Sequence, residues 1–276
     1  MNAAYYHQLG DQYLSQGQFE MALRAYQQAL TLGGPDPELH LARGDALRRM
    51  GRLNEALQEI HLAVELSPLH PGARLALATI YQMQQQPARA LLELNRAIEL
   101  MPGNPEGYFQ RGLFYQRAGQ LRLALQDLSR AVSLGEGEMR FLAGRGRLHL
   151  AMGDAAEAQR DFSQALMSDP NSPPLYYEMA QALKALGRRR EAAEALRTCL
   201  AGTPDATLRQ KVQAELGTLQ DLPKSEVSLP PEVRREVQDL LQRGEKAEAL
   251  KRVAQVSGAG LTAARAYLDQ LTGSVR

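Results

Sequence analysis

The 276-residue sequence predicts an all-α protein. Leucine occurs 45 times, against 9 valines and 3 isoleucines, so the chain is poor in the β-branched residues that pack well in sheets. The sequence also repeats itself every 34 residues, a period that accommodates two helices and a turn. Together these two observations predict a stack of helical hairpins, in which each hairpin buries its apolar face against the next.

The charge and hydropathy of the chain argue against several classes of partner. Lysine and arginine number 32 and aspartate and glutamate 31, and this net charge of +1 provides no overall attraction to nucleic acid or to an anionic membrane. No stretch approaches the roughly 18 apolar residues of a membrane span, and the first residues lack the basic region and apolar run of a secretory signal. The single cysteine, Cys199, allows no internal disulfide and fits a reducing compartment. We therefore expect a cytoplasmic protein without nucleic-acid or membrane partners.

Each 34-residue unit contains the same columns of small and large residues. The first small column is Ala22, Ala56, Ala90, Ala124, Ala158 and Ala192, and the second is Ala29, Ala63, Ala97, Ala131, Ala165 and Cys199. Midway between them lies a bulky column of Tyr26, Ile60, Leu94, Leu128, Phe162 and Leu196, and earlier in each unit come Gly10, Gly44, Ala78, Gly112, Gly146 and Ala180. We expect the small residues to let the two helices of a unit approach closely, while the bulky residue fills the gap to the next unit.

Glycine marks the turn between the two helices of a unit. It occurs in five of the six units, at Gly17, Gly51, Gly119, Gly153 and Gly187. The third unit has Gln84-Gln85-Gln86 instead, and we expect any irregularity of the stack near this turn. Four units close with a proline, which cannot continue a helix, at Pro68, Pro102, Pro170 and Pro204; Gly34 and Glu136 occupy that position in the other two.

These columns resemble the tetratricopeptide repeat, whose pattern is a bulky residue, Leu-Gly and an aromatic, then Ala, an aromatic or aliphatic residue, Ala and a closing Pro. The resemblance covers residues 3–206 as six units without insertion, at 3–36, 37–70, 71–104, 105–138, 139–172 and 173–206. It implies a right-handed superhelical solenoid of helix-turn-helix repeats. The stretch 207–221 has an apolar stripe and polar remaining faces, and we expect it to cap the solenoid as a helix, completing a unit at 3–221.

A second, smaller module is predicted after the solenoid. Residues 222–231 carry three prolines and two serines and are expected to form a linker. Residues 232–276 are expected to form a small bundle of three short helices, for which an ubiquitin-associated-like bundle is a looser description. The segment 246–269 resembles the helical hairpin of the bacterial ribosomal stalk protein's C-terminal domain, which presents basic residues to translation factors. The corresponding candidate contacts are Lys246, Lys251, Arg252 and Arg265.

The tetratricopeptide resemblance also implies a ligand groove on the concave face, lined by positions 2, 5, 9 and 12 of each repeat. The candidate groove residues are Leu41, Asp45, Arg48, Leu75, Phe109, Leu113, Gln116, Arg140, Arg147, Tyr177 and Lys184. Their composition favours a ligand with an apolar anchor followed by acidic residues. The alternative is that the long apolar side chains pack on neighbouring helices. One subset of the family grips the carboxylate tails of heat-shock chaperones with a set of Lys, Asn and Arg residues, and no window of three repeats supplies that set here.

The sequence contains no recognisable catalytic constellation. The five histidines lie in different contexts without a third metal ligand nearby, and the turn at 257–260 lacks the strand and the Lys-Ser/Thr of a phosphate loop. Cys199 occupies a small-residue column, where packing is expected rather than nucleophilic catalysis. We therefore expect a non-enzymatic scaffold or adaptor, without cofactor or metal, that binds a partner peptide or protein in the groove. The alternative is a regulatory or targeting subunit of a larger enzyme or of the translation apparatus, which recognises its partner through the C-terminal hairpin.

Overall fold

The computed structural model describes residues 2–203, 205–220 and 229–257, together with Ala264, Tyr267, Leu268 and Leu271. These residues form helices, turns and connecting segments, with no strand among them, so the all-α prediction is confirmed. The chain divides into two compact units, Met1–Thr203 and Pro204–Arg276.

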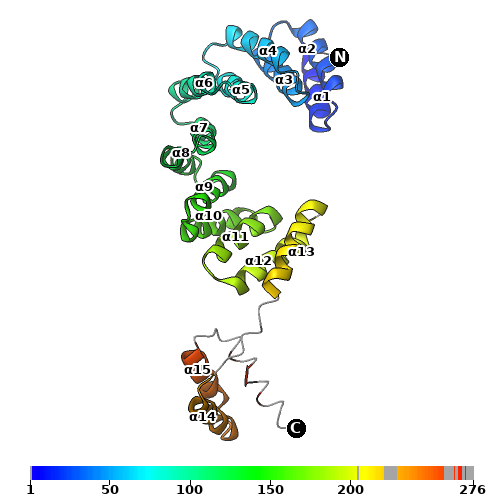
Figure 1. Ribbon diagram of the computed structural model, residues 1–276. Coiled ribbons are helices and arrows are strands. Elements are labelled where there is room, and N and C mark those ends of the chain that lie inside the picture. The colour runs from blue at the N-terminus through cyan, green and yellow to red at the C-terminus, as the bar shows by residue number, and fades with distance from the viewer. Residues whose placement is uncertain are drawn as a thin grey trace. The chain divides into compact units, whose positions relative to one another are not determined.

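Twelve helices lie in the described part of the first unit, arranged as six pairs (Figure 1). In chain order they are α1 (Ala3–Ser15), α2 (Phe19–Gly33), α3 (Pro37–Arg49), α4 (Leu53–Leu66), α5 (Pro71–Met83), α6 (Pro87–Leu100), α7 (Pro105–Arg117), α8 (Leu121–Leu134), α9 (Met139–Met152), α10 (Ala155–Ser168), α11 (Pro173–Ala185) and α12 (Arg189–Gly202). The odd-numbered helices begin at residues 3, 37, 71, 105, 139 and 173, the first residue of each predicted unit. The 34-residue period therefore gives the helix boundaries as well as the fold.

The odd-numbered helices begin with strong N-terminal signals. Proline occupies the first helical position of α3, α5, α7 and α11, where its missing N–H leaves no donor unpaired. The residue before the helix accepts a hydrogen bond from a backbone N–H of the first turn in the first four repeats, at Asn2, Asp36, His70 and Asn104. These caps form a further column in the sequence with the same spacing of 34 residues.

The turn within each pair is a Schellman motif, in which two backbone N–H groups return to the end of the first helix. In the first repeat the N–H of Gln18 donates to the carbonyl of Tyr13 at 2.9 Å, and Gly17 has a φ of 72°. The third repeat keeps this geometry without glycine, because the N–H of Gln86 donates to the carbonyl of Tyr81 at 2.8 Å and Gln85 has a φ of 59°. This turn is therefore regular, and the irregularity expected of the stack near it lies at the neighbouring step between α5 and α7, the loosest of the five odd-numbered steps. Gln85 instead adopts a left-handed conformation that costs an L-residue roughly 1–2 kcal/mol.

The small and large columns meet between the two helices of each repeat. A Cβ added to Gly146 of α9 would lie 2.7 Å from the ring of Phe162 on α10, and one added to Gly112 of α7 would lie 2.9 Å from Leu128 on α8. Both large residues are completely buried. The small residue thus lets the paired helices approach, as predicted. The bulky residue packs beneath the first helix of its own repeat and also belongs to an apolar cluster with residues of the next repeat, such as Leu128 with Phe141 and Leu148 of α9. This agrees with the gap-filling role expected for it.

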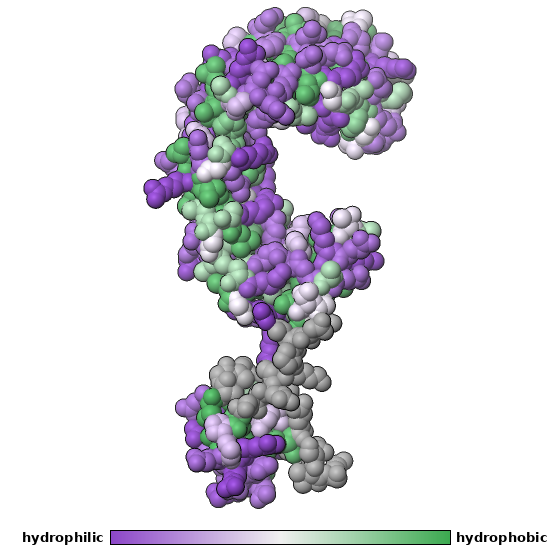
Figure 2. Space-filling view, in the orientation of Figure 1, coloured by the Kyte–Doolittle hydropathy of each residue, from purple (hydrophilic) through white to green (hydrophobic). Residues whose placement is uncertain are grey.

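The stack is tighter along its odd-numbered helices than along its even-numbered ones. The pairs α1–α3, α3–α5, α7–α9 and α9–α11 make closer contacts than any two successive even-numbered helices. A stack that is shorter on one side curves toward that side. Figure 2 shows the curve of this unit, and Figure 1 shows the odd-numbered helices along its concave side. The contact between α5 and α7 is the loosest of the five odd-numbered steps.

The second unit contains α13 (Ala206–Gln220), α14 (Pro231–Gln242) and α15 (Lys246–Ser257). Helices α14 and α15 pack around a small apolar cluster that Leu229, Ala264 and Leu268 complete. Gly244 follows the end of α14 with a φ of 81°. The capping role of 207–221 and the linker at 222–231 stay predictions, since residues 221–228 lie outside the described residues.

Candidate functional site

The predicted groove residues are distributed over α3, α5, α7, α9 and α11, the helices of the concave side. Leu41 and Leu113 are half-buried and rest on the apolar clusters beneath them. Leu75, Gln116 and Tyr177 are also half-buried. Each of these side chains is therefore partly packed within the protein and partly accessible to a ligand.

Phe109 is placed differently from our expectation. It is only 9% exposed, and its ring meets the ring of Phe141 edge-on with the centroids 5.1 Å apart. On α9 a glycine, Gly144, leaves the space that the Phe109 ring occupies. The packing alternative raised from the sequence therefore holds at this position, and Phe109 is a core residue between α7 and α9 rather than an open anchor.

Arg140 and Arg147, candidate groove residues whose charge favoured an acidic ligand, have carboxylate partners. Arg140 on α9 forms ion pairs with Glu106 on α7 at 2.6 Å and with Glu138 at 2.8 Å. Arg147 on α9 pairs with Glu178 on α11 at 3.0 Å. These bridges tie successive odd-numbered helices together and neutralise much of the expected positive charge.

Glu178 is the more unusual partner, because burial raises its pKa despite the opposing effect of Arg147. One carboxylate oxygen accepts the hydrogen bond from Arg147, while the other is buried without a hydrogen-bond partner in the described part of the chain. On α3, Asp45 accepts hydrogen bonds from Arg48 at 3.1 Å and from Arg49 at 2.8 Å. That local group carries a net positive charge.

A series of buried ion pairs joins the two helices of the middle repeats, and our sequence reasoning missed it. Arg145 donates two hydrogen bonds to Asp161, at 2.9 and 2.6 Å, and Arg111 donates two to Asp127, at 2.7 and 2.8 Å. These hydrogen bonds raise the pKa of both guanidinium groups. A signal was available: arginine recurs at Arg43, Arg111 and Arg145, and an acid at Glu59, Glu93, Asp127 and Asp161, both with the repeat's spacing.

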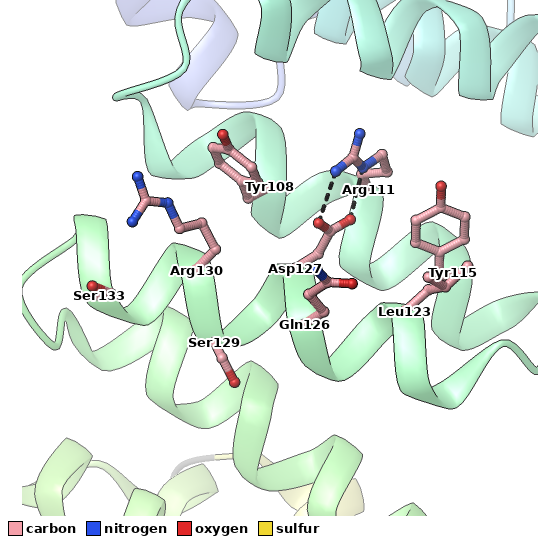
Figure 3. A pocket seen from close by; sticks show the side chains of 9 residues that line it. All are labelled: Tyr108, Arg111, Tyr115, Leu123, Gln126, Asp127, Ser129, Arg130 and Ser133. Carbon is pink, nitrogen blue, oxygen red and sulfur yellow. Dashed lines mark hydrogen bonds and ion pairs between the residues drawn. The ribbon is translucent and has the colours of Figure 1, made fainter.

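A pocket of about 580 Å³ lies between α7 and α8 and was also not predicted (Figure 3). Its lining consists of Tyr108, Arg111 and Tyr115 from α7 and of Leu123, Gln126, Asp127, Ser129, Arg130 and Ser133 from α8. The Arg111 guanidinium lies 5.9 Å from the ring centres of both Tyr108 and Tyr115. The only sequence signal for this pocket was a pair of tyrosines that flank an arginine of the buried series.

The remaining candidates occupy separate places. Cys199 is completely buried and burial raises the pKa of its thiol, which suits packing rather than nucleophilic attack. In the second unit Lys246 and Lys251 are exposed, whereas Arg252 donates a hydrogen bond to Glu236 at 3.0 Å and thereby joins α15 to α14. Arg265 lies outside the described residues.

Two further properties concern the described residues. None of the helices found there combines the length and the apolar character needed to cross a membrane. In the same part of the chain, potential metal ligands do not gather in groups of three or more.

Three family models, all of the tetratricopeptide repeat (TPR), match the chain, at residues 10–51, 37–80 and 149–216. Together they cover about half of it. The chain belongs to the TPR proteins. None of the three models extends past residue 216, so the resemblance of the C-terminal segment to the ribosomal stalk protein gains no support.

Solved TPR structures agree with this assignment. A thermophilic TPR protein from Thermus thermophilus is 25% identical, with a TM-score of 0.59 over 66% of this chain and 99% of that chain. YrrB, described as a TPR protein with an unusual peptide-binding site, is 22% identical, with a TM-score of 0.51 over 69% and 98%. A TPR protein from Parabacteroides merdae is 18% identical, with a TM-score of 0.60 over 93% and 99%. No curated protein matches the sequence.

Proposed function

We propose that this TPR protein is a non-enzymatic scaffold that binds an extended segment of a partner protein along its concave side. The observation that carries the proposal is a row of four polar side chains at the same position of four repeats, which we call the inner row. It consists of Arg48, Gln82, Gln116 and Lys184, on α3, α5, α7 and α11. All four are half-buried.

The chemistry of the inner row suits the backbone and the acidic side chains of a peptide. A glutamine amide both donates and accepts hydrogen bonds, so Gln116 can pair with the N–H and C=O groups of an extended chain. The oxygen of Gln82 already accepts a hydrogen bond from Arg117 at 2.6 Å, and its amide N–H groups can donate to a ligand carbonyl. Arg48 and Lys184 can bind carboxylates on either side of them. Leu75 and Leu113 on the same helices offer apolar contact, the part that we first assigned to Phe109.

The family and its solved members support this proposal at a coarser level. TPR proteins generally mediate protein–protein interactions. The description of YrrB names a peptide-binding site on a solenoid of the same fold. Neither observation identifies the partner of this chain.

The test is affinity capture with the full-length protein and a matched pair of charge reversals. Lys184→Glu changes the inner row, whereas Arg197→Glu makes the same change of charge at an exposed position on α12, the second helix of the same repeat. We expect a specific partner to be captured by the wild type and by Arg197→Glu but to be lost with Lys184→Glu.

Arg197→Glu alters an exposed residue and should melt at the wild-type temperature, whereas Lys184 is half-buried and donates a hydrogen bond to Gln181, so the melting temperature of Lys184→Glu is measured beside its capture of the partner. A partner retained equally by both variants, and also by Gln116→Ala, would show that the inner row does not bind it. Failure of the wild type to capture any partner would likewise count against the proposal.

A further inference from the structure

The two helices that form the pocket, α7 and α8, carry more positive charge than their own carboxylates can neutralise. The acidic residues of these two helices are both paired: Glu106 with Arg140, and Asp127 with Arg111. Arg122 and Arg130 on α8 have no carboxylate partner among the described residues. The surface of this helix pair therefore carries uncompensated positive charge, and Arg130 brings that charge into the lining of the pocket.

The lining also contains hydrogen-bonding groups that the protein itself does not use. Within the described part of the chain, the side-chain hydroxyls of Tyr108, Tyr115, Ser129 and Ser133 have no hydrogen-bond partner. Figure 3 shows Tyr108, Arg130 and Ser133 toward one end of the pocket and Tyr115 with Leu123 toward the other. One end is thus a set of donors around a cation, and the other presents an aromatic ring beside an exposed leucine.

The floor of the pocket is held in place before any ligand arrives. Arg111 donates two hydrogen bonds to Asp127 and a third, at 2.8 Å, to Asn95 on α6. The two tyrosine rings flank the fixed guanidinium. A preformed site of this kind loses little conformational entropy when a ligand binds.

We propose that this pocket binds an acidic peptide segment that also carries an apolar side chain. Its carboxylates would face Arg130 and the hydroxyl of Tyr108, and its apolar side chain would lie against Leu123 and the ring of Tyr115. The volume of about 580 Å³ lies within the usual range of ligand pockets, and a few residues of peptide fill such a space. This contact is additional to the proposed function, because it uses a different set of side chains in repeat four.

The proposal is tested by fluorescence anisotropy with the full-length protein and a labelled peptide, Asp-Glu-Leu-Asp-Glu, with Lys-Lys-Leu-Lys-Lys as the probe of opposite charge. Arg130→Glu alters the pocket, and Arg122→Glu makes the same change on the same helix outside the lining. We expect saturable binding of the acidic probe only, weakened about tenfold by Arg130→Glu and less than about twofold by Arg122→Glu. Tyr108→Phe keeps the ring and removes the hydroxyl, and we expect it to weaken binding about threefold.

Three results would overturn the proposal. Equal losses from the two reversals would mean that the acidic peptide responds only to the charge of the whole surface. Loss of binding with Lys184→Glu would place the peptide in the inner row instead. Absence of saturable binding to the wild type would mean that the pocket takes no such segment. Because Tyr108→Phe leaves the packing of the ring intact, it remains informative if Arg130→Glu disturbs the fold.

Discussion

Removal of Asp161 is expected to destabilise the protein by about 2–4 kcal/mol. Arg145 donates two hydrogen bonds to this carboxylate, whose side chain is only 6% exposed. Loss of one partner of a buried ion pair leaves the other charge uncompensated, which costs roughly 3–5 kcal/mol. The Arg145 side chain is 23% exposed and keeps some access to water, so we place the cost of Asp161→Ala slightly below that range.

The double variant Arg145→Leu/Asp161→Ala should recover most of this loss. In the first repeat the two equivalent positions hold Leu9 and Ala25, and that repeat forms the same helix pair. An ion pair replaced by apolar residues of adequate volume is often neutral or stabilising. We therefore expect the double variant to lie within about 1 kcal/mol of the wild type.

Urea denaturation of the wild type, both single variants and the double variant, followed by far-UV circular dichroism at neutral pH, closes the cycle. A double variant as unstable as Asp161→Ala would refute the reasoning, since it would mean that the bidentate pair supplies stability that apolar packing cannot. An Asp161→Ala variant with the same free energy of unfolding as the wild type would also refute it.

Five further substitutions test the turns, the helix contacts and the buried carboxylate. Gln85→Gly is expected to raise the free energy of unfolding by about 0.5–1 kcal/mol, because glycine adopts the φ of 59° without strain. Gly119→Gln is expected to lower it by a similar amount. Urea midpoints that move the other way would contradict both expectations. Gly146→Ala is expected to cost about 1–3 kcal/mol, because the new methyl group meets a buried aromatic ring. Gly112→Ala meets a buried leucine side chain at 2.9 Å, which can shift more easily than a ring, and is expected to cost less. A larger drop in melting temperature for Gly112→Ala than for Gly146→Ala would count against this packing. Burial raises the pKa of Glu178 above the ordinary glutamate value of 4.5. Between pH 4.5 and this raised pKa the native state binds more protons than the unfolded state, so stability falls as the pH rises through this window. In Glu178→Gln this fall should be smaller, as urea midpoints on either side of the window would show.

The fold was predictable because its information is repeated along the chain. A column of small residues such as Ala124 and its equivalents reports the same contact six times, and an accidental pattern would not keep a spacing of 34 residues. Gln85 shows what a single departure from the pattern can predict. The missing glycine predicted an irregularity of the stack near this turn, and the step between α5 and α7 is the loosest of the stack. The turn itself keeps the hydrogen bonds of the Schellman motif, with a glutamine in the same backbone conformation.

The candidate site was less predictable, because it depends on contacts between repeats. The register places Phe109 on the face of α7 toward the concave side, yet the direction of its ring is decided by Gly144, in the following repeat. The charge of the groove was similarly misjudged, since Arg147 finds its carboxylate 31 residues away, at Glu178. The chemistry of the pocket beside Tyr108 depends on which hydroxyls and charges stay unpaired once the helices have packed. The repeat pattern of the sequence does not show this.

Because the contact between α5 and α7 is the loosest, we expect the solenoid to bend most easily at this step. Three repeats lie on each side of this step, so a small rotation about it swings two arms of equal length and changes the span between their tips more than the same rotation at any other step. The inner row crosses this point between Gln82 and Gln116. A ligand bound along the inner row would contact repeats on both sides of this step and would restrict the rotation of one half of the solenoid against the other.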